Sequence, residues 1–209
     1  MPPRINNIST LRHKIKKIPR EKSAFRPKRT IFVSNETQCA MKVRFTTDRN
    51  GVSRIDYQLL PTRFDEMLTA WNANGELCFA AFTTYRGRER VMRELATLFP
   101  DATLREVDDR RSVFDEPPAA ILLAGTPFRH DVWRALLEIP YGQTVTYARL
   151  AELAGHPRAV RAVGTAVGSN PICHIVPCHR VVPTAGGTGN YHGGAEIKKA
   201  LLAEEARTE

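Results

Sequence analysis

The chain has 209 residues, of which 42% are hydrophobic and 25% charged, and its formal net charge is +9. This length and hydrophobic content suit one large or two small folded domains and exclude a wholly disordered chain. No apolar run approaches the roughly 20 residues of a membrane span, and no continuous apolar segment follows the basic N-terminus. The sequence therefore predicts neither a membrane protein nor a secretory signal.

The excess positive charge lies at the N-terminus. Residues 1–30 hold ten Lys or Arg residues and one acidic residue, whereas the rest of the chain holds 21 of each sign. These 30 residues are polar and show no steady hydrophobic period, so we expect a disordered basic arm. Such an arm either adds salt-dependent affinity for phosphate backbones or serves as a solubilising or import segment.

Cysteine usage indicates a reducing compartment. The cysteines at positions 39, 78, 173 and 178 have neither the density of a disulfide framework nor the spacing of a metal site. We expect an intracellular location, the cytoplasm of a prokaryote or the nucleus of a eukaryote. A zinc site made of Cys173, Cys178, His179 and His192 is a weaker alternative, because that spacing is atypical of zinc ligands.

The first half of the chain predicts a small sheet with one helix. Asn74-Gly75 is a hairpin turn signal, and Arg88–Phe99 has the period of an amphipathic helix that ends at Pro100. The charged, proline-bearing stretch Asp101–Pro118 is expected to be a linker or surface loop. The predicted strands are Thr30–Val33, Met41–Thr46, Ser53–Leu60, Met67–Trp71 and Glu76–Phe82.

The second half predicts mainly helices. Thr126 is placed to cap a helix whose first turn holds Pro127, and Thr146 to cap a helix over Tyr147–Ala154. A further helix is expected from Pro157 to about Ser169, so that the pair forms a helix-turn-helix. The expected fold class is α/β (α+β): a basic arm (1–30), an N-terminal mixed α/β sheet domain (31–118) and a mainly helical C-terminal domain (119–209).

The second helix of that pair carries cations where the helix dipole disfavours them. Its apolar side holds valines and alanines, and the other side holds Arg158, Arg161 and Thr165 near the helix start. Arginines in that position suggest an anionic partner such as nucleic acid. The alternative is a solvated face, the usual environment of helical arginines.

The stretch Ile175–Val182 is the strongest candidate for a reactive site. β-Branched apolar runs that predict buried strand flank Pro177, which forces the backbone out of regular pairing, so Cys178 is expected at a rigid bend. Only a thiolate attacks carbon, and the neighbouring His179 could accept the thiol proton. The alternative is a cysteine that acts only as a small buried hydrophobe.

The C-terminal segment offers a partner for that histidine. The last helix, expected from about Ala195 to Ala206, places Ile197, Leu201 and Glu205 on one stripe, and a carboxylate on a buried stripe needs a partner. Glu205 could orient and polarise His179. Before this helix, glycines between Thr184 and Gly194 predict a loop whose backbone can approach a flat ligand.

The motif Pro177-Cys178-His179-Arg180-Val181 resembles the acceptor-cysteine motif of the O6-alkylguanine-DNA alkyltransferases, the methylated-DNA–protein-cysteine methyltransferases. The resemblance runs from about Thr126 to Glu205. It implies a relay from Cys178 through water to His179 and Glu205. It also implies that Tyr147 protonates the departing base and that Arg161 fills the space left by an extruded nucleotide.

The resemblance implies the rest of the site as well. Asn170 would tie the helix-turn-helix to the acceptor strand, and Tyr191 with the backbone around Val181 and His192 would line the base pocket. Cys173 stands where relatives often carry Pro or Ala, and His192 where they carry Ser or Trp. These two departures leave the pocket width and the contact to O6 open.

The function implied is DNA repair by one irreversible transfer of an alkyl group from O6-alkylguanine in double-stranded DNA to Cys178, with O4-alkylthymine as a further candidate substrate. The resemblance implies that the second helix of the helix-turn-helix binds the minor groove and that the lesion is flipped out of the duplex into the site. No cofactor and no metal are expected, and the protein is expected to be a monomer. The alternatives are a non-catalytic alkyl-lesion sensor or helix-turn-helix regulator, and a Cys–His hydrolase, which would need an oxyanion hole and a further orienting residue.

Overall fold

The computed structural model describes residues 41–109 and 111–207. The expected basic arm, the expected strand Thr30–Val33 and Cys39 lie outside the described residues. In the first half of the chain the elements are β1 (Lys42–Thr46), β2 (Arg54–Pro61), β3 (Glu66–Asn72), β4 (Leu77–Phe82), α1 (Arg88–Leu98), β5 (Thr103–Glu106) and β6 (Ala120–Ala124). In the second half they are α2 (Pro127–Leu137), β7 (Val145–Thr146), α3 (Tyr147–Leu153), α4 (Val160–Gly168), the 3-10 turn η2 (Cys178–Arg180), β8 (Val181–Val182) and α5 (Ala195–Glu205).

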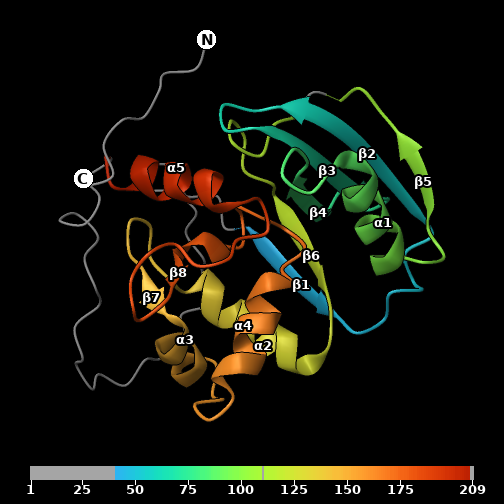
Figure 1. Cartoon of the computed structure of the whole chain (residues 1–209). Coiled ribbons are helices and arrows are strands. Elements are labelled where there is room, and N and C mark those ends of the chain that lie inside the picture. The colour runs from blue at the N-terminus through green and yellow to red at the C-terminus, as the bar shows by residue number, and fades with distance from the viewer. Residues whose placement is uncertain (1–40, 110, 208–209) are drawn as a thin grey trace.

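The six long strands form one mixed sheet in the order β1-β6-β4-β3-β2-β5. The strands β3 and β4 pair antiparallel, as the hairpin signal predicted, and β2 pairs antiparallel with β3. The strand β6 lies parallel to both β1 and β4. The strands β7 and β8 form a separate two-stranded pair. The α/β (α+β) class is confirmed, with the sheet mainly in the first half and the helical bundle in the second (Figure 1).

The inner strands of the sheet, β3, β4 and β6, are buried on both faces, and β6 shows how. Ile121 and Leu123 face the cluster that contains the second half of the chain, whereas Leu122 and Ala124 face the cluster that contains α1. This alternation follows from the two-residue period of a strand. The sheet thus separates α1 from the C-terminal helices (Figure 1), and the site is built on the side away from α1.

Sequence signals predicted two helix starts correctly, those of α2 and α3. Thr126 caps α2 by accepting a hydrogen bond from Arg129 N at 3.3 Å, and Thr146 caps α3 by accepting one from Arg149 N at 3.1 Å. The expected start of the next helix at Pro157 was wrong. α4 begins at Val160, because Ala159 has non-helical dihedral angles and the preceding residues form a turn.

Two other expectations need correction. The stretch read as a linker contains β5, which pairs in parallel with the edge of β2. The apolar segment after residue 118, assigned by sequence to the C-terminal domain, is β6 and lies inside the sheet between β1 and β4. Within residues 41–109 and 111–207, no helix combines the length and hydropathy needed to cross a bilayer.

Candidate active site

A single amide side chain shapes the segment that carries Cys178. Asn170, just after α4, donates hydrogen bonds from Nδ2 to the carbonyls of Ile172 (3.3 Å) and Val176 (2.9 Å), and its Oδ1 accepts from Ile172 N at 3.0 Å. These contacts fold residues 170–176 into a turn. The expected strand before Pro177 was therefore wrong: the Ile172 and Val176 carbonyls bond the Asn170 side chain, and no ladder pairing starts at Ile175.

The same segment is attached to the sheet. Ala80 N on β4 donates to the carbonyl of Pro171 at 2.9 Å, and Cys173 N donates to the carbonyl of Ala80 at 2.8 Å. After Pro177 the chain makes the turn η2, which begins at Cys178, and then pairs Val181 with Val145 of β7. The acceptor segment is thus held between the sheet and the helix-turn-helix.

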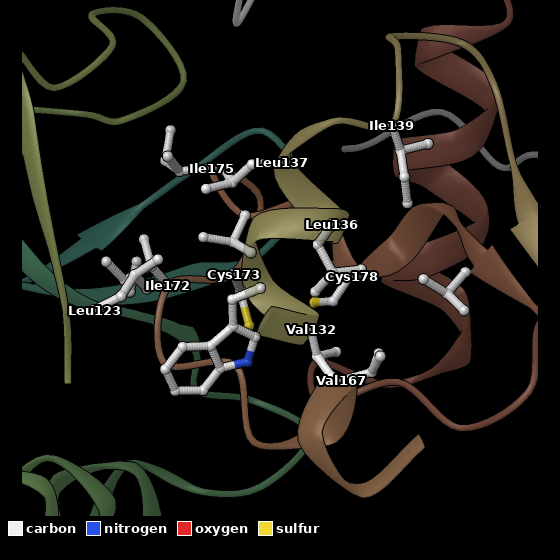
Figure 2. Packing of buried hydrophobic residues seen from close by; sticks show 14 of the residues in the cluster. Leu123, Val132, Leu136, Leu137, Ile139, Val167, Ile172, Cys173, Ile175 and Cys178 are labelled. Atoms are coloured by element: carbon white, nitrogen blue, oxygen red, sulfur yellow. The ribbon is translucent and has the colours of Figure 1, made fainter. Parts of the chain in front are cut away.

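The sulfur of Cys178 is buried within a polar shell inside the hydrophobic core. The residue is 4% exposed, and Asn170 Nδ2 lies 3.1 Å from its Sγ. Figure 2 shows Cys173 and Cys178 within the same cluster of apolar side chains. Both cysteines belong to this buried cluster, so two cysteines five residues apart share one site.

These neighbours favour the thiolate at Cys178. Its pKa is lowered, first because Cys173 donates a hydrogen bond to the sulfur, and then because Asn170 donates a second bond and Lys198 supplies a positive charge; burial opposes all three. The pKa of Cys173 is raised by the same contact and by burial. Asn170 and the charge of Lys198 both stabilise the thiolate of Cys178, so Cys178 is the cysteine of this pair that ionises.

Lys198 was missed by sequence reasoning. It lies on α5, is completely buried, and donates a hydrogen bond from Nζ to the carbonyl of Val181 at 2.6 Å. Burial lowers its pKa to about 8, while the nearby Cys178 raises it. A signal was present: residues 198, 201, 202 and 205 share a helical stripe, and buried lysines are rare unless they are paired.

His179 and Glu205 meet as expected. The imidazole is fully buried, and its Nε2 lies 2.8 Å from Glu205 Oε1. Burial lowers the pKa of His179 and outweighs the raising effect of Glu205, so the ring is neutral and able to accept a proton. Among the described residues its Nδ1 has no hydrogen-bond partner.

Arg180, which belongs to the acceptor-cysteine motif, is also part of this network. Its Nη2 and Nε bond Glu205 at 2.9 to 3.1 Å, and its Nη1 donates to the carbonyl of Ile139 at 2.7 Å. Gly142 N also donates to Glu205, at 3.2 Å. Burial by itself would raise the pKa of Glu205, but the bonds from His179 and Arg180 lower it to about 2. Glu205 is therefore ionised at neutral pH and fixes the orientation of His179.

Two tyrosines lie near the sulfur. Tyr147 begins α3 and sits between α4 and the glycine-rich loop: a Cβ on Gly164 would lie 3.7 Å from its ring, and one on Gly189 3.8 Å from its hydroxyl. Burial and the nearby Cys178 raise its pKa, so it keeps its proton. Tyr191 is buried, and its hydroxyl has no hydrogen-bond partner among the described residues. Burial and the neighbouring Cys173 and Cys178 raise its pKa.

The helix-turn-helix presents an exposed polar edge. Arg161 in the first turn of α4 and Thr165 one turn later are both exposed. Arg158 is also exposed, but it lies in the turn before α4 and so does not share the helical face that the sequence predicted. The structure thus leaves two of the three expected contact residues on one face of α4.

The two remaining pocket candidates, Val181 and His192, contact different parts of the molecule. The Val181 carbonyl accepts from Lys198, and His192 Nε2 lies 2.8 Å from Glu94 Oε2 on α1. With His179 bonded to Glu205 and His192 to Glu94, the four residues of the zinc alternative do not converge. In the part of the chain that the structure describes, no three His, Cys, Asp or Glu side chains form a metal-binding group.

Comparisons with known proteins identify the family of the chain. Residues 127–207 match the family described as 6-O-methylguanine DNA methyltransferase, DNA binding domain. The solved structure of Mycobacterium tuberculosis O6-methylguanine methyltransferase is 32% identical, with a TM-score of 0.53, over 74% of this chain and 94% of that one. The chain belongs to the methylated-DNA–protein-cysteine methyltransferase family.

Other relatives of this methyltransferase family support the assignment. The inducible methylated-DNA–protein-cysteine methyltransferase of Bacillus subtilis (strain 168) is 46% identical over 101 residues, which are 48% of this chain and 55% of that protein. The M. tuberculosis OGT solved in complex with DNA is 29% identical, with a TM-score of 0.56, over 73% of this chain and 93% of that one. The match spans about half the length of the curated relatives. The family match contains Cys178, His179, Glu205, Tyr147, Arg161 and Lys198.

Proposed function

We propose that this methyltransferase-family chain repairs DNA by one irreversible transfer of an alkyl group from O6 of guanine to Cys178. The observation that carries the proposal is the single buried network of Cys178, Asn170 and Lys198 beside His179 and Glu205. It supplies a favoured thiolate, a neutral imidazole and a fixed carboxylate, which are the parts of an activated cysteine nucleophile.

In the proposed transfer, every proton and electron pair is accounted for without a cofactor. The thiol proton passes through a bridging water to the unpartnered Nδ1 of His179, and Glu205 stabilises the imidazolium that results. The thiolate attacks the alkyl carbon, the S–C bond forms, and the O6–C bond breaks with its electron pair on the base. Tyr147, which stays protonated at neutral pH, donates a proton to the departing base. The product is a thioether, so each molecule acts once.

The substrate must come to the sulfur. Only 4% of Cys178 is exposed, so the sulfur cannot reach a base that is stacked inside a duplex. We therefore infer that the lesion is flipped out, with Arg161 filling the gap in the stack and the backbone near Tyr191 lining the pocket. Double-stranded DNA carrying O6-alkylguanine is the partner, O4-alkylthymine is a second candidate substrate, and the protein acts as a monomer in an intracellular, reducing compartment.

The test is stoichiometric labelling. Duplex DNA with radiolabelled O6-methylguanine, in molar excess over the protein, is incubated with the full-length wild type, with Cys178→Ala and, as a matched control, with Cys78→Ala on β4. We expect one label per active molecule for the wild type and Cys78→Ala, and none for Cys178→Ala. Repeated turnover, or label that persists on Cys178→Ala, would contradict the proposal. Binding of the lesion without any transfer by the wild type would instead favour a lesion sensor.

A further inference from the structure

A second feature, beside the Cys178 network, is a cavity lined by arginines. Its volume is about 700 Å³, and it lies beside α1 where the sheet meets the C-terminal end of α4. Apolar side chains form part of its lining, those of Phe79, Ala81 and Leu98. Its walls carry five arginines from separate parts of the chain: Arg49 after β1, Arg86, Arg90 and Arg93 around α1, and Arg129 on α2.

The charges in this cavity do not balance. Residues 31–209 contain equal numbers of basic and acidic residues, yet five arginines and a single carboxylate, that of Glu94, line this one cavity. Glu94 lies 3.0 Å from Arg86 and 3.4 Å from Arg90, so it offsets those two. Arg49 and Arg129 have no acidic partner among the described residues, and Arg93 has only the exposed Glu89 at 3.8 Å.

The chemistry of these side chains indicates which ligand the cavity binds. Arginine does not lose its proton in a protein, so clustered guanidinium groups repel one another unless an anion lies between them. Apolar side chains in the lining lower the local dielectric and strengthen the attraction for that anion. Guanidinium groups bind phosphate with paired, directional hydrogen bonds. The most suitable ligand is therefore a phosphate ester.

The cavity also borders the acceptor site. Asn170, which bonds Cys178 Sγ, forms part of one wall, and His192, the neighbour of Tyr191, forms another. His192 bonds the same Glu94 that offsets Arg86 and Arg90. We propose that the arginine cavity binds phosphate groups, either those of the DNA backbone flanking the flipped base or those of a free nucleotide. The DNA source rests on the function proposed above, whereas the nucleotide source does not.

A pair of matched double variants tests the site. Arg49→Gln/Arg129→Gln removes the two cavity arginines without a carboxylate partner. Arg54→Gln/Arg105→Gln removes the same charge from the far edge of the sheet, where both arginines contact Asp56. Each full-length protein is titrated with inorganic pyrophosphate by calorimetry and with undamaged duplex DNA over a range of salt concentrations.

The two sources give different results. A nucleotide-type site predicts saturable 1:1 binding of pyrophosphate that weakens at least tenfold in the cavity variant but not in the edge variant, with equal DNA salt slopes. A backbone site predicts that the slope of log K against log salt falls by about 1 to 2 in the cavity variant alone. Equal behaviour of the two variants in both titrations would overturn the proposal. Failure of labelling at Cys178 would contradict the repair function but would leave these binding results standing.

Discussion

Charged groups are largely exposed in the sheet half of the molecule and buried in the acceptor site. In the sheet half, pairs such as Arg105–Asp56 and Arg44–Glu76 join the sheet to its edges, with the arginines about half exposed. In the acceptor site, His179, Glu205 and Lys198 are almost fully withdrawn from water. Exposed pairs contribute little to stability, whereas a buried charge is costly unless every partner is present. The buried set is thus kept for chemistry, and it is where single changes should act most strongly.

The largest effect is expected for Glu205→Gln. Removing the carboxylate charge leaves Arg180 and the His179 ring without their partner, so we expect a loss of about 3–5 kcal/mol in unfolding free energy. The neighbouring Glu204, which is partly exposed and bonds Arg63 at 2.7 Å, provides a matched control. Glu204→Gln should cost less than about 1 kcal/mol. Equal losses in urea denaturation would remove the distinction between the two regions.

The Glu205 effect should also depend on pH. Its pKa is lowered from 4.5 to about 2, so the folded state binds fewer protons than the unfolded state between these values. The stability that Glu205 provides is complete above pH 4.5 and is lost as the pH falls through 2. The difference between the wild type and Glu205→Gln should therefore narrow on acidification, as chemical denaturation at a series of pH values would show. A constant difference would mean that the carboxylate charge is not the cause.

The next effect is expected for Lys198→Met, which keeps the volume of the side chain and removes its charge. We expect alkyl transfer at neutral pH to slow about tenfold, because a unit charge near a buried thiolate is worth at least 1.4 kcal/mol. Since the pKa of Lys198 is lowered to about 8, the wild-type rate should decline as the pH rises through 8. Single-turnover rates across this range should show that decline in the wild type and not in Lys198→Met. A decline in both proteins would assign it to another group.

A smaller effect is expected for Cys173→Ala. The variant removes the hydrogen bond that contributes most to lowering the pKa of Cys178, so that pKa should rise and transfer at neutral pH should slow by ~3–10-fold. Ultraviolet absorbance of the thiolate against pH measures the change directly. Cys78→Ala is the control, since Cys78 is buried on β4 and bonds the carbonyl of Ala70. An unchanged titration of Cys178 would show that Cys173 only fills space.

The least effect on the chemistry is expected from the basic arm. Deleting residues 1–30 should flatten the salt dependence of DNA binding, because counterion release scales with the number of phosphate contacts. The rate of transfer from bound DNA should not change, because the exposed charges of the arm are screened by salt and so act only weakly on the buried reacting groups. An unchanged salt slope would mean that the arm does not contact DNA.

The sequence predicted what depends on local patterns and failed where the outcome depends on distant partners. The caps Thr126 and Thr146 could be predicted from spacing and residue type, whereas the meeting of His179 with Glu205 was implied by the family resemblance. The strand β5 could not be predicted, because it has four mostly exposed residues and, within the described part of the chain, pairs only with the edge of β2.

The site shows the same division. Lys198 reads as an ordinary solvated helical lysine until α5 packs it against the Val181 carbonyl. The expected strand before Pro177 is absent because the side-chain amide of Asn170, six residues earlier, bonds the carbonyl of Val176. Only the lysine therefore depends on a partner that is distant in the sequence.

The position of β6 has a consequence for how the molecule comes apart. Because β6 enters between β1 and β4, a chain cut between residues 118 and 119 would lose the strand that joins β1 to the sheet and would bare the backbone edge of β4. An uncovered edge of that kind invites aggregation. The two halves should therefore melt in a single cooperative transition, and neither proteolytic fragment should persist alone.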